Sequence, residues 1–387
     1  MYRVIEVGQI VAGPMAGLLF SELGFEVIKI EEPGKGDVSR QLTGVSSGTF
    51  AFLNRGKKSL TLNLKSQEGR GLFVRLVEKS DVVIDNLGPE TLTRLGLGYD
   101  VLRRANPRIV YLKIKGFGPG PDAWRKSLDF PAEVESGIAY MNGLEGRPMR
   151  LGASMIDIFA ASLGVIGVLA GLLERGVSGV GCYVEVPLFE AATFLMGQHL
   201  ASAQALGREL RPLNEEPFTW GVYDFFETGD AKKIFVAVTT DSQWREFCLE
   251  FDALHLWKRP ELQSNAGRYA NRSWLIPEIA KIIKGKTLVE VVEKLNRSNV
   301  AYGVLNKSLD LLKSKQLEYD GKMMNVRNTD GKLLKVPRVP IYNESGVIYP
   351  QPPGDPPRLG EHTDQILRDL LGVAGEDIAR LHEEHVV

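Results

Sequence analysis

Cysteine is scarce in this sequence, with two residues in 387. Cys182 and Cys248 stand alone in unrelated segments, so they form neither a disulfide framework nor a zinc-binding pattern. The five histidines are scattered as well, and none has the spacing of a metal-binding pair. We therefore expect no metal site, and the isolated thiols indicate a protein of the reducing cytoplasm.

An excess of charge is also missing, since 47 Lys and Arg face 48 Asp and Glu. Without a basic field we expect no nucleic-acid partner, and a local cluster would have to hold any anionic ligand. The N-terminal segment MYRVIEVGQIV runs straight into a strand pattern. It has neither the cationic start nor the longer apolar core of a signal peptide.

Long apolar runs are represented by one stretch, from Leu151 to Leu173, whose single charge is Asp157. Apolar residues at helical spacing nearly all round predict a buried helix. The length would also suit a transmembrane helix. A lone segment that carries an acid and precedes ordinary soluble sequence is more typical of a core helix, so we expect no membrane association.

Asp157 has two interpretations. Ser154 and Asp157 form S-x-x-D before an apolar run, which is typical of a helix cap, and spacing alone favours this reading. Alternatively, Asp157 is a carboxylate nucleophile at a helix N-terminus, held ionised by backbone N–H groups.

The chain is too long for a single core, so two domains are expected. Residues 1–205 alternate strands and helices, which predicts a large α/β domain with a doubly wound parallel sheet. Residues 206–217 have the composition of a linker, and 218–325 predict a smaller α+β domain. Residues 326–387 are proline-rich and end in a helix, Thr363 to Leu371. We expect this segment to return to the large domain.

Loops after the predicted strands are candidate binding segments. The first, GQIVAGP, contains glycine but does not match the dinucleotide pattern G-x-G-x-x-G. Asn86 and Arg94 follow the strand DVVID, at the sheet edge where ligands of parallel sheets bind. Arg55, Lys57 and Lys58 could receive phosphates, although such a cluster is more often solvated surface.

Seven segments, in order and spanning nearly the whole chain, carry a family resemblance. They are IVAGPMAGLLFSELGFEVIKIE, LNRGKKSLTLNLKSQEGR, VVIDNLGPETLTRLGLGYD, IKGFGPG, MIDIFAASLGVIGVLAGLLER, YVEVPLFEA and PRLGEHTDQILRDLLG. The chain resembles the class III CoA-transferases, the group that includes carnitine, formyl-CoA and benzylsuccinate CoA-transferases and the α-methylacyl-CoA racemases. This resemblance implies two domains and a homodimer whose chains interlock like rings.

The resemblance also implies a chemistry. In the family's transferases an aspartate attacks an acyl-CoA, commonly succinyl-CoA, and passes CoA to a carboxylic acid through an anhydride and an aspartyl-CoA thioester. The family's nucleophile falls on Asp157, so the nucleophile interpretation now outweighs the cap. Coenzyme A is then a substrate, and no permanently bound cofactor is implied.

Four motifs carry over the family's CoA contacts. They are Val11 and Ala12; Leu62, Asn63, Leu64 and Lys65; Asn86, Leu87, Gly88 and Arg94; and Lys126, Ser127, Leu128 and Asp129. Two features are missing, the first typical of the family and the second found in some of its formyl-CoA transferases. An arginine after the second strand is replaced by Glu31-Glu32-Pro33, and the small domain has no glycine-rich lid, the nearest segment being 215–222.

Two alternatives to a transferase are considered. The racemases' histidine falls on Leu128, which cannot take a proton, and for Asp241, near their acidic residue, we favour a helix cap. A silent CoA-binding partner subunit is the other alternative, although the presence of Asp157 speaks against it. The aromatic residues Trp220, Tyr223, Phe225 and Phe226 could line an acyl pocket, but in a hairpin they are more often core.

Overall fold

The computed structural model describes residues 1–215, 219–344, 346–347 and 354–387. It divides into two compact units, Met1–Leu210 with Lys315–Val387, and Arg211–Ser314. The second unit ends before residue 325, because the strand β10 (Met323–Arg327) contacts the first unit's helix α2 (Thr49–Asn54). Residues 216–218 of the predicted linker and of the segment 215–222 lie outside the described residues, as do 348–353 of the proline-rich return.

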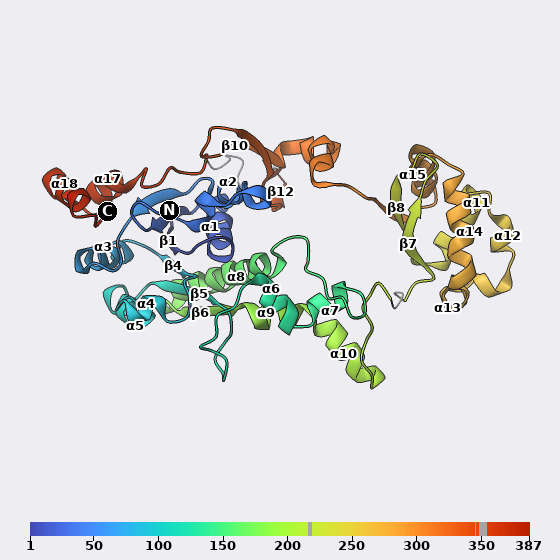
Figure 1. Cartoon of the computed structure of the whole chain (residues 1–387), viewed down its shortest axis with the longest axis horizontal. Helices are drawn as coiled ribbons and strands as arrows, with labels where there is room; N and C mark the ends of the chain where they lie inside the picture. The colour runs from blue at the N-terminus through green and yellow to red at the C-terminus, as the bar shows by residue number, and fades with distance from the viewer. Residues whose placement is uncertain (216–218, 345, 348–353) are drawn as a thin grey trace. The chain divides into compact units, whose positions relative to one another are not determined.

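A six-stranded parallel sheet forms the centre of the first unit (Figure 1). Its strands are β1 (Arg3–Val7), β2 (Glu26–Glu31), β3 (Lys58–Thr61), β4 (Val82–Asp85), β5 (Val110–Lys115) and β6 (Tyr183–Pro187). Their order is β3-β2-β1-β4-β5-β6, so the direction of winding reverses between β1 and β4. This is the topology of a doubly wound sheet, and it confirms the predicted fold class.

Helices cover both faces of this sheet, which is why its strands read as nearly continuous apolar runs. The helices of the first unit are α1 (Ala12–Glu22), α2, α3 (Gln67–Glu78), α4 (Thr91–Arg94), α5 (Tyr99–Ala105), α6 (Asp129–Glu135), α7 (Ile138–Asn142), α8 (Met155–Ser178), α9 (Leu188–Leu195), α10 (Gly197–Leu206), α16 (Lys315–Glu318), α17 (Thr363–Gln365) and α18 (Gly375–Glu383). Apolar residues of α1, α8 and α9 form the core on one face. Those of α3, α4, α5 and the C-terminal helices form it on the other.

The long apolar helix α8 lies on the sheet, but it is buried on one side only. Ile156, Ala160 and Val168 are fully buried, whereas Leu173 and Val177 are 78% and 88% exposed. By length and composition alone the helix could cross a membrane, but core helices of soluble proteins pass the same test. The expectation of burial all round was therefore wrong for this single chain, because none of the described elements of the first unit covers the outer face.

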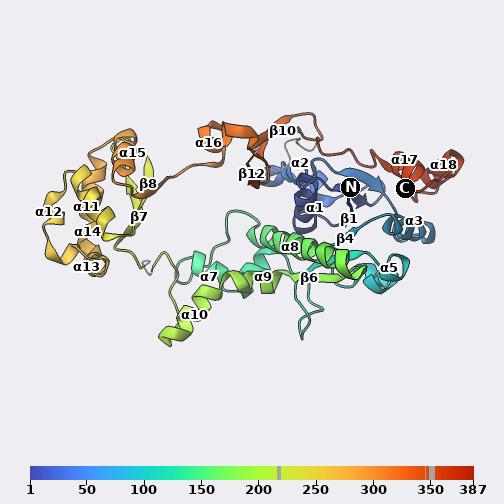
Figure 2. The same cartoon turned by 180° about the vertical axis from the view of Figure 1, so that it is seen from behind.

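The C-terminal segment packs along the outer strand β3. Thr61 N–H donates to Thr363 Oγ1 at 3.0 Å, and Asn63 N–H donates to the Val386 carbonyl at 2.8 Å. In both views α17 and α18 lie beside α3, at the end of the sheet where the chain terminates (Figures 1 and 2). The predicted last helix is interrupted, because a π-helical turn (Ile366–Leu370) follows α17, and α18 was not predicted.

A buried ion triad also fixes the C-terminal segment. The Glu22 carboxylate of α1 contacts Arg55 at 2.7 Å and Arg338 at 3.1 Å, and all three side chains are at most 5% exposed. Arg55 also donates to the Pro337 carbonyl, the last residue of β11 (Leu333–Pro337), which pairs with β10. A short hairpin, β12 (Tyr342–Asn343) with β13 (Gly346–Val347), follows.

In its described residues the second unit has a three-stranded antiparallel sheet and five α-helices. Its elements are β7 (Val222–Glu227), β8 (Lys233–Val238), β9 (Ala301–Val304), α11 (Asp241–Glu250), α12 (Leu254–Trp257), α13 (Asn265–Ala270), α14 (Arg272–Lys284) and α15 (Leu288–Arg297). Phe226 is buried in its core and Phe225 is exposed. The ring of Tyr223 is tilted against Trp220 and meets Phe235 edge to face.

The cap of helix α11 corrects a prediction about Asp241. Thr240 is the capping residue, because its hydroxyl accepts from Gln243 N–H in a capping box. Asp241 follows as the first helical residue and pairs with the buried Arg268 at 2.7 Å. The sequence pattern located the helix start correctly to within one residue, but it assigned the cap to the wrong side chain.

Candidate functional site

Asp157 lies in the first turn of α8, but it does not cap the helix. Ser154, at the cap position, makes no capping bond through its side chain. Instead the Asp129 carboxylate, from the start of α6, accepts from Ile156 N–H at 2.9 Å and from Asp157 N–H at 3.2 Å. The cap interpretation of the Ser154–Asp157 pattern is therefore wrong, since a residue 28 positions earlier satisfies the helix.

The Asp157 side chain is left without hydrogen bonds in the described part of the chain. It is partly buried, and this burial raises its pKa to about 7. The negative charge of Asp129 adds to the increase, while Arg150 opposes it. The backbone N–H groups that were expected to hold Asp157 ionised are occupied by Asp129, and burial favours the protonated form of this carboxyl.

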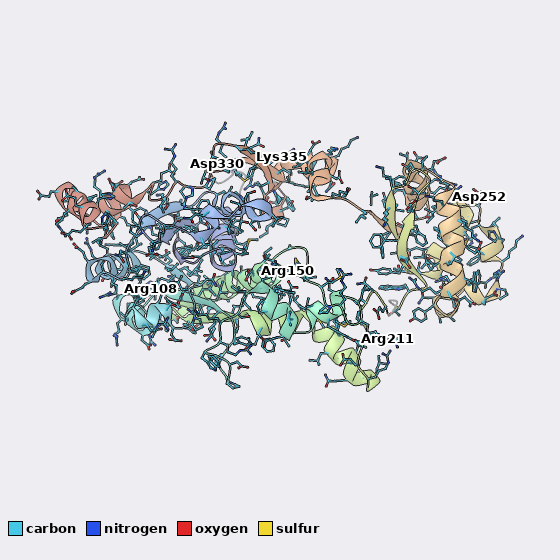
Figure 3. The ribbon with its side chains drawn as sticks, viewed as in Figure 1. Arg108, Arg150, Arg211, Asp252, Asp330 and Lys335 are labelled. Carbon is cyan, nitrogen blue, oxygen red and sulfur yellow. The ribbon has the colours of Figure 1, made fainter. Side chains whose placement is uncertain are left out.

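Two further charges surround this helix start. Glu133 of α6 is fully buried and accepts from Leu151 N–H at 2.9 Å. Burial raises its pKa, and Asp129 acts in the same direction. Arg150, in the loop before α8 (Figure 3), pairs with Asp129 at 3.2 Å and is half exposed. Three carboxyl groups thus share one nearby guanidinium, which favours protonation of the least well paired of them.

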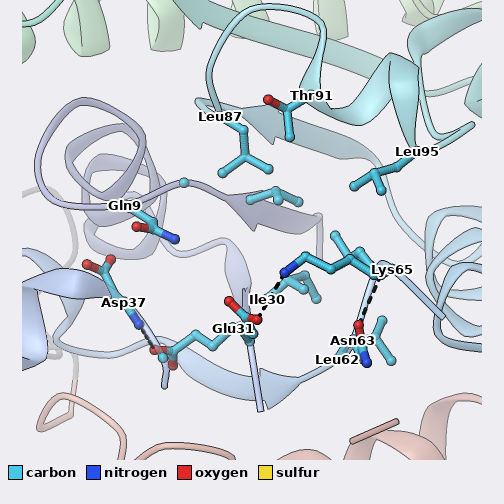
Figure 4. A pocket seen from close by; sticks show the side chains of 15 residues that line it. Gln9, Ile30, Glu31, Asp37, Leu62, Asn63, Lys65, Leu87, Thr91 and Leu95 are labelled. Atoms are coloured by element: carbon cyan, nitrogen blue, oxygen red, sulfur yellow. Dashed lines mark hydrogen bonds and ion pairs between the residues drawn. The ribbon is translucent and has the colours of Figure 1, made fainter. Parts of the chain in front are cut away.

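A cavity of about 150 Å³ opens at the carboxyl ends of β1 to β4 (Figure 4). This is the edge of a doubly wound sheet at which ligands bind, and it lies where the strand order reverses. Five of the predicted CoA contacts line it: Leu62, Asn63, Leu64, Lys65 and Leu87. The other lining residues are Val7, Gly8, Gln9, Ile30, Glu31, Glu32, Gly36, Asp37, Thr91 and Leu95.

Exposed lysines stand at the rim of this cavity around one carboxylate. Glu32 contacts Lys35 at 3.0 Å and Lys65 at 3.2 Å, and both bonds lower the pKa of Glu32. Glu31, in contrast, is buried and bound by Arg40 at 2.7 Å. The two glutamates that replace the family arginine are therefore both paired with cations.

Asn86 anchors the start of α1. Its Oδ1 accepts from Gly13 N–H at 2.9 Å, and its Nδ2 donates to the Ile114 carbonyl at 3.2 Å. Val11 and Ala12, which begin this helix, are partly and fully buried. The side chain of Asn86 therefore holds the first loop against β5.

The third CoA motif (Asn86, Leu87, Gly88 and Arg94) lies next to the fourth (Lys126, Ser127, Leu128 and Asp129). A Cβ built on Gly88 would lie 4.0 Å from Lys126 Cε, and Lys126 is exposed. Ser127 packs on Gly116, where a Cβ would come within 2.7 Å of it. Leu128 is 67% exposed. Arg94 is exposed too, and its guanidinium lies 3.5 Å from the Thr91 hydroxyl.

The proposed phosphate cluster is not confirmed. Arg55 and Lys57 are buried and bound to carboxylates, so neither is a solvated cation or an open phosphate ligand. Burial lowers the pKa of Lys57 to about 8, and Glu6 opposes this effect. One signal could have indicated these contacts: the charged residues inside the apolar strands VIEV and VIKI require buried partners. Among the described residues no group of His, Cys, Asp and Glu could hold a metal ion.

Comparisons with known proteins cover almost the whole chain. A sequence model of CoA-transferase family III matches residues 2–363. The chain is 31% identical to a succinyl-CoA–L-malate CoA-transferase alpha subunit of Chloroflexus aurantiacus, over 100% of this chain and 91% of that protein. It is 28% identical to the human succinyl-CoA:glutarate CoA-transferase, over 100% and 89%. The structure of a CAIB/BAIF family protein from Brucella suis matches with a TM-score of 0.82 at 28% identity, over 95% and 98%.

Proposed function

Because this chain belongs to CoA-transferase family III, we propose that it moves CoA from succinyl-CoA to a dicarboxylic acid through a covalent intermediate on Asp157. That it is a CoA-transferase follows from the family and from relatives that bear this name. The identity of the two acids is our inference. It is supported by the names of those relatives, which pair succinyl-CoA with malate and with glutarate.

One observation carries the assignment of Asp157. Its carboxyl group lies at the start of α8 and is partly shielded from water, and burial raises its pKa to about 7. It makes no hydrogen bond in the described residues. A carboxylate that is poorly solvated and poorly hydrogen-bonded is a stronger nucleophile than one in water. Asp129 leaves it in this condition by taking the helix N–H groups.

The proposed reaction consists of four acyl transfers. The ionised Asp157 attacks the thioester carbonyl, which forms a mixed anhydride and expels CoA thiolate. The thiolate attacks the aspartyl carbonyl, giving an aspartyl-CoA thioester and releasing the donor acid as its carboxylate. The acceptor carboxylate then attacks this thioester, and the released thiolate takes the acceptor's acyl group and regenerates Asp157. Every step passes an acyl group between CoA, Asp157 and a carboxylate, so no acyl group is transferred to water and the energy of the thioester is kept.

We propose that the first unit binds CoA along the carboxyl edge of its sheet. The cavity of Figure 4 and the exposed cations Lys65, Arg94 and Lys126 support this assignment. The rim lysines offer point charges and Arg94 a planar fork for phosphate groups. The apolar side chains Leu62, Leu64 and Leu87 offer a surface for the adenine ring.

We also propose a cytoplasmic homodimer. The dimer is supported by the exposed apolar stripe of α8, in which Ile166, Leu173 and Val177 share one outer face, with Phe194 of α9 also exposed. Patches of this kind usually mark an interface. Light scattering should give twice the mass of one chain, and Val177→Lys should shift the protein toward monomer.

The test of the function is a screen of carboxylic acids with succinyl-CoA, in which new thioesters are read by mass spectrometry. Hydroxylamine added during turnover should convert Asp157 to a hydroxamate that peptide mapping locates. Asp157→Asn should lower turnover by more than about 10³-fold while CoA still binds, whereas the exposed Asp100→Asn should be normal. A near-normal rate for Asp157→Asn would refute the assignment.

The same samples separate the alternatives. A silent partner subunit would bind CoA but give no hydroxamate with any acyl-CoA. A racemase would exchange the α-hydrogen of its substrate for deuterium without an acceptor acid. Leu128 stands where the racemases have their histidine, which disfavours that outcome. Proton transfer on both faces of the α-carbon needs two acid–base groups.

A further inference from the structure

Two charged side chains lie inside the apolar runs of neighbouring central strands. Glu6 of β1 and Lys29 of β2 are partners in the parallel ladder, and both side chains are fully buried. The Lys29 ammonium contacts Glu6 Oε1 at 2.7 Å and Asp37 Oδ2 at 2.8 Å. Buried ion pairs are often no more stabilising than apolar residues of similar volume. Stability alone therefore does not explain why charges occupy these positions.

Two members of this triad, Lys29 and Asp37, bond to the backbone of the loop between β1 and α1. Lys29 Nζ donates to the Gly8 carbonyl at 3.0 Å. Asp37 Oδ1 accepts from Ile10 N–H at 3.2 Å. The triad thus joins two strands of the sheet to two points of one short loop.

The helix that follows the loop is tied to the same charges. Lys57 Nζ contacts Glu6 Oε2 at 2.6 Å and donates to the Pro14 carbonyl in the first turn of α1. A Cβ at Gly17 would lie 1.9 Å from Glu6 Oε2, so α1 can approach the network this closely only because residue 17 is glycine.

Ile10 shows that the loop does not rest in its preferred conformation. Its φ is 67°, in the left-handed region that β-branched residues strongly disfavour. Backbone strain of this kind persists only where surrounding contacts impose it. The bond from Ile10 N–H to Asp37 is such a contact, so the loop should relax when the triad is removed.

The strained loop forms one wall of the cavity. Gly8 and Gln9 line it, and so does Asp37 itself, which faces Gln9 in Figure 4. We propose that Glu6, Lys29 and Asp37 are positioning residues that hold the β1–α1 loop in the shape that receives CoA. This inference rests on the proposed function, since it assumes that CoA occupies this cavity.

The test replaces two of the three charges. The Glu6 carboxylate that remains keeps Lys57 as its partner at 2.6 Å, so no buried charge is left unpaired. In Lys29→Met/Asp37→Leu both partners become apolar, so the protein should fold, which circular dichroism verifies. Calorimetric titration should show that its dissociation constant for CoA rises at least about tenfold, while kcat at saturating succinyl-CoA stays within about threefold. The KM for the acceptor acid should not change.

A second substitution tests the loop itself. Asparagine adopts the left-handed conformation more readily than isoleucine. Adding Ile10→Asn to the double variant should therefore recover part of the affinity for CoA, which a general loss of stability could not explain. Glu26→Gln is the matched control, because Glu26 pairs with Arg3 and Lys58 at the other end of the same strands. It should bind CoA normally.

The outcomes distinguish the two proposals. A wild-type protein that binds no CoA contradicts the proposed function. Wild-type binding with an unchanged dissociation constant in the folded double variant contradicts the positioning role and leaves the proposed function intact. Weakened binding that Ile10→Asn does not improve would also overturn the role of the loop.

Discussion

Replacing the proposed nucleophile should stabilise the protein at alkaline pH. Asp157→Asn keeps the shape of the side chain but removes a charge that its surroundings disfavour, because burial raises the pKa of this carboxyl to about 7. Active-site groups are commonly retained at a cost in stability. We therefore expect the variant to be inactive and more stable than the wild type.

The magnitude follows from the difference between the folded and unfolded pKa values. The ordinary value is 3.8 and the folded value about 7, and each unit corresponds to about 1.4 kcal/mol. The folded chain keeps this proton up to about pH 7, whereas the unfolded chain loses it near pH 4. The wild type should therefore lose stability between these values as pH rises. The free energy of unfolding of Asp157→Asn should exceed that of the wild type by at most about 4 kcal/mol at pH 8 and by almost nothing at pH 4.

The measurement is urea unfolding at a series of pH values, followed by far-ultraviolet circular dichroism and by hydrogen exchange of α8. Tryptophan fluorescence would serve poorly, since four of the five tryptophans lie in the other unit. Asp100→Asn is the control, because an exposed acid in a first helical turn should stabilise slightly, by less than about 1 kcal/mol. An advantage of Asp157→Asn that does not grow with pH would refute the reasoning.

Three further predictions concern the same framework. First, kcat/KM should rise about tenfold per pH unit up to about pH 7 and then level off, because only ionised Asp157 attacks; a profile that is flat from about pH 5 to 8 would contradict this. Second, if the Lys65 ammonium binds the 3′-phosphate, Lys65→Ala should raise the KM for succinyl-CoA more than the KM for 3′-dephospho-CoA thioesters. Equal changes in the two KM values would mean that Lys65 does not contact this phosphate. Third, Glu22→Gln should lower the free energy of unfolding by about 3–5 kcal/mol, because two buried guanidinium groups lose their counter-charge. Denaturant titration measures this difference. A loss below about 1 kcal/mol would mean that the ion triad contributes little to stability.

The strands of the first unit could be predicted because each is a short, nearly continuous apolar run between helices. That pattern depends on residues close together in the sequence, as does the capping box at Thr240. The last helices were less predictable. The π-helical turn after α17 and the packing of α18 depend on contacts with β3 and α3, about 300 residues earlier.

Asp157 illustrates the same division. The sequence alone determined that one acid stands at the head of the only long apolar helix, and family motifs then indicated its role. Tertiary structure decided its chemical state, because Asp129 takes the helix N–H groups and no group in the described residues bonds to the carboxyl of Asp157. Local sequence patterns indicate which polar groups need hydrogen-bond partners. The tertiary fold determines which distant residue becomes the partner of each group. A carboxylate's pKa depends on that outcome, since charge and burial act through space rather than along the chain.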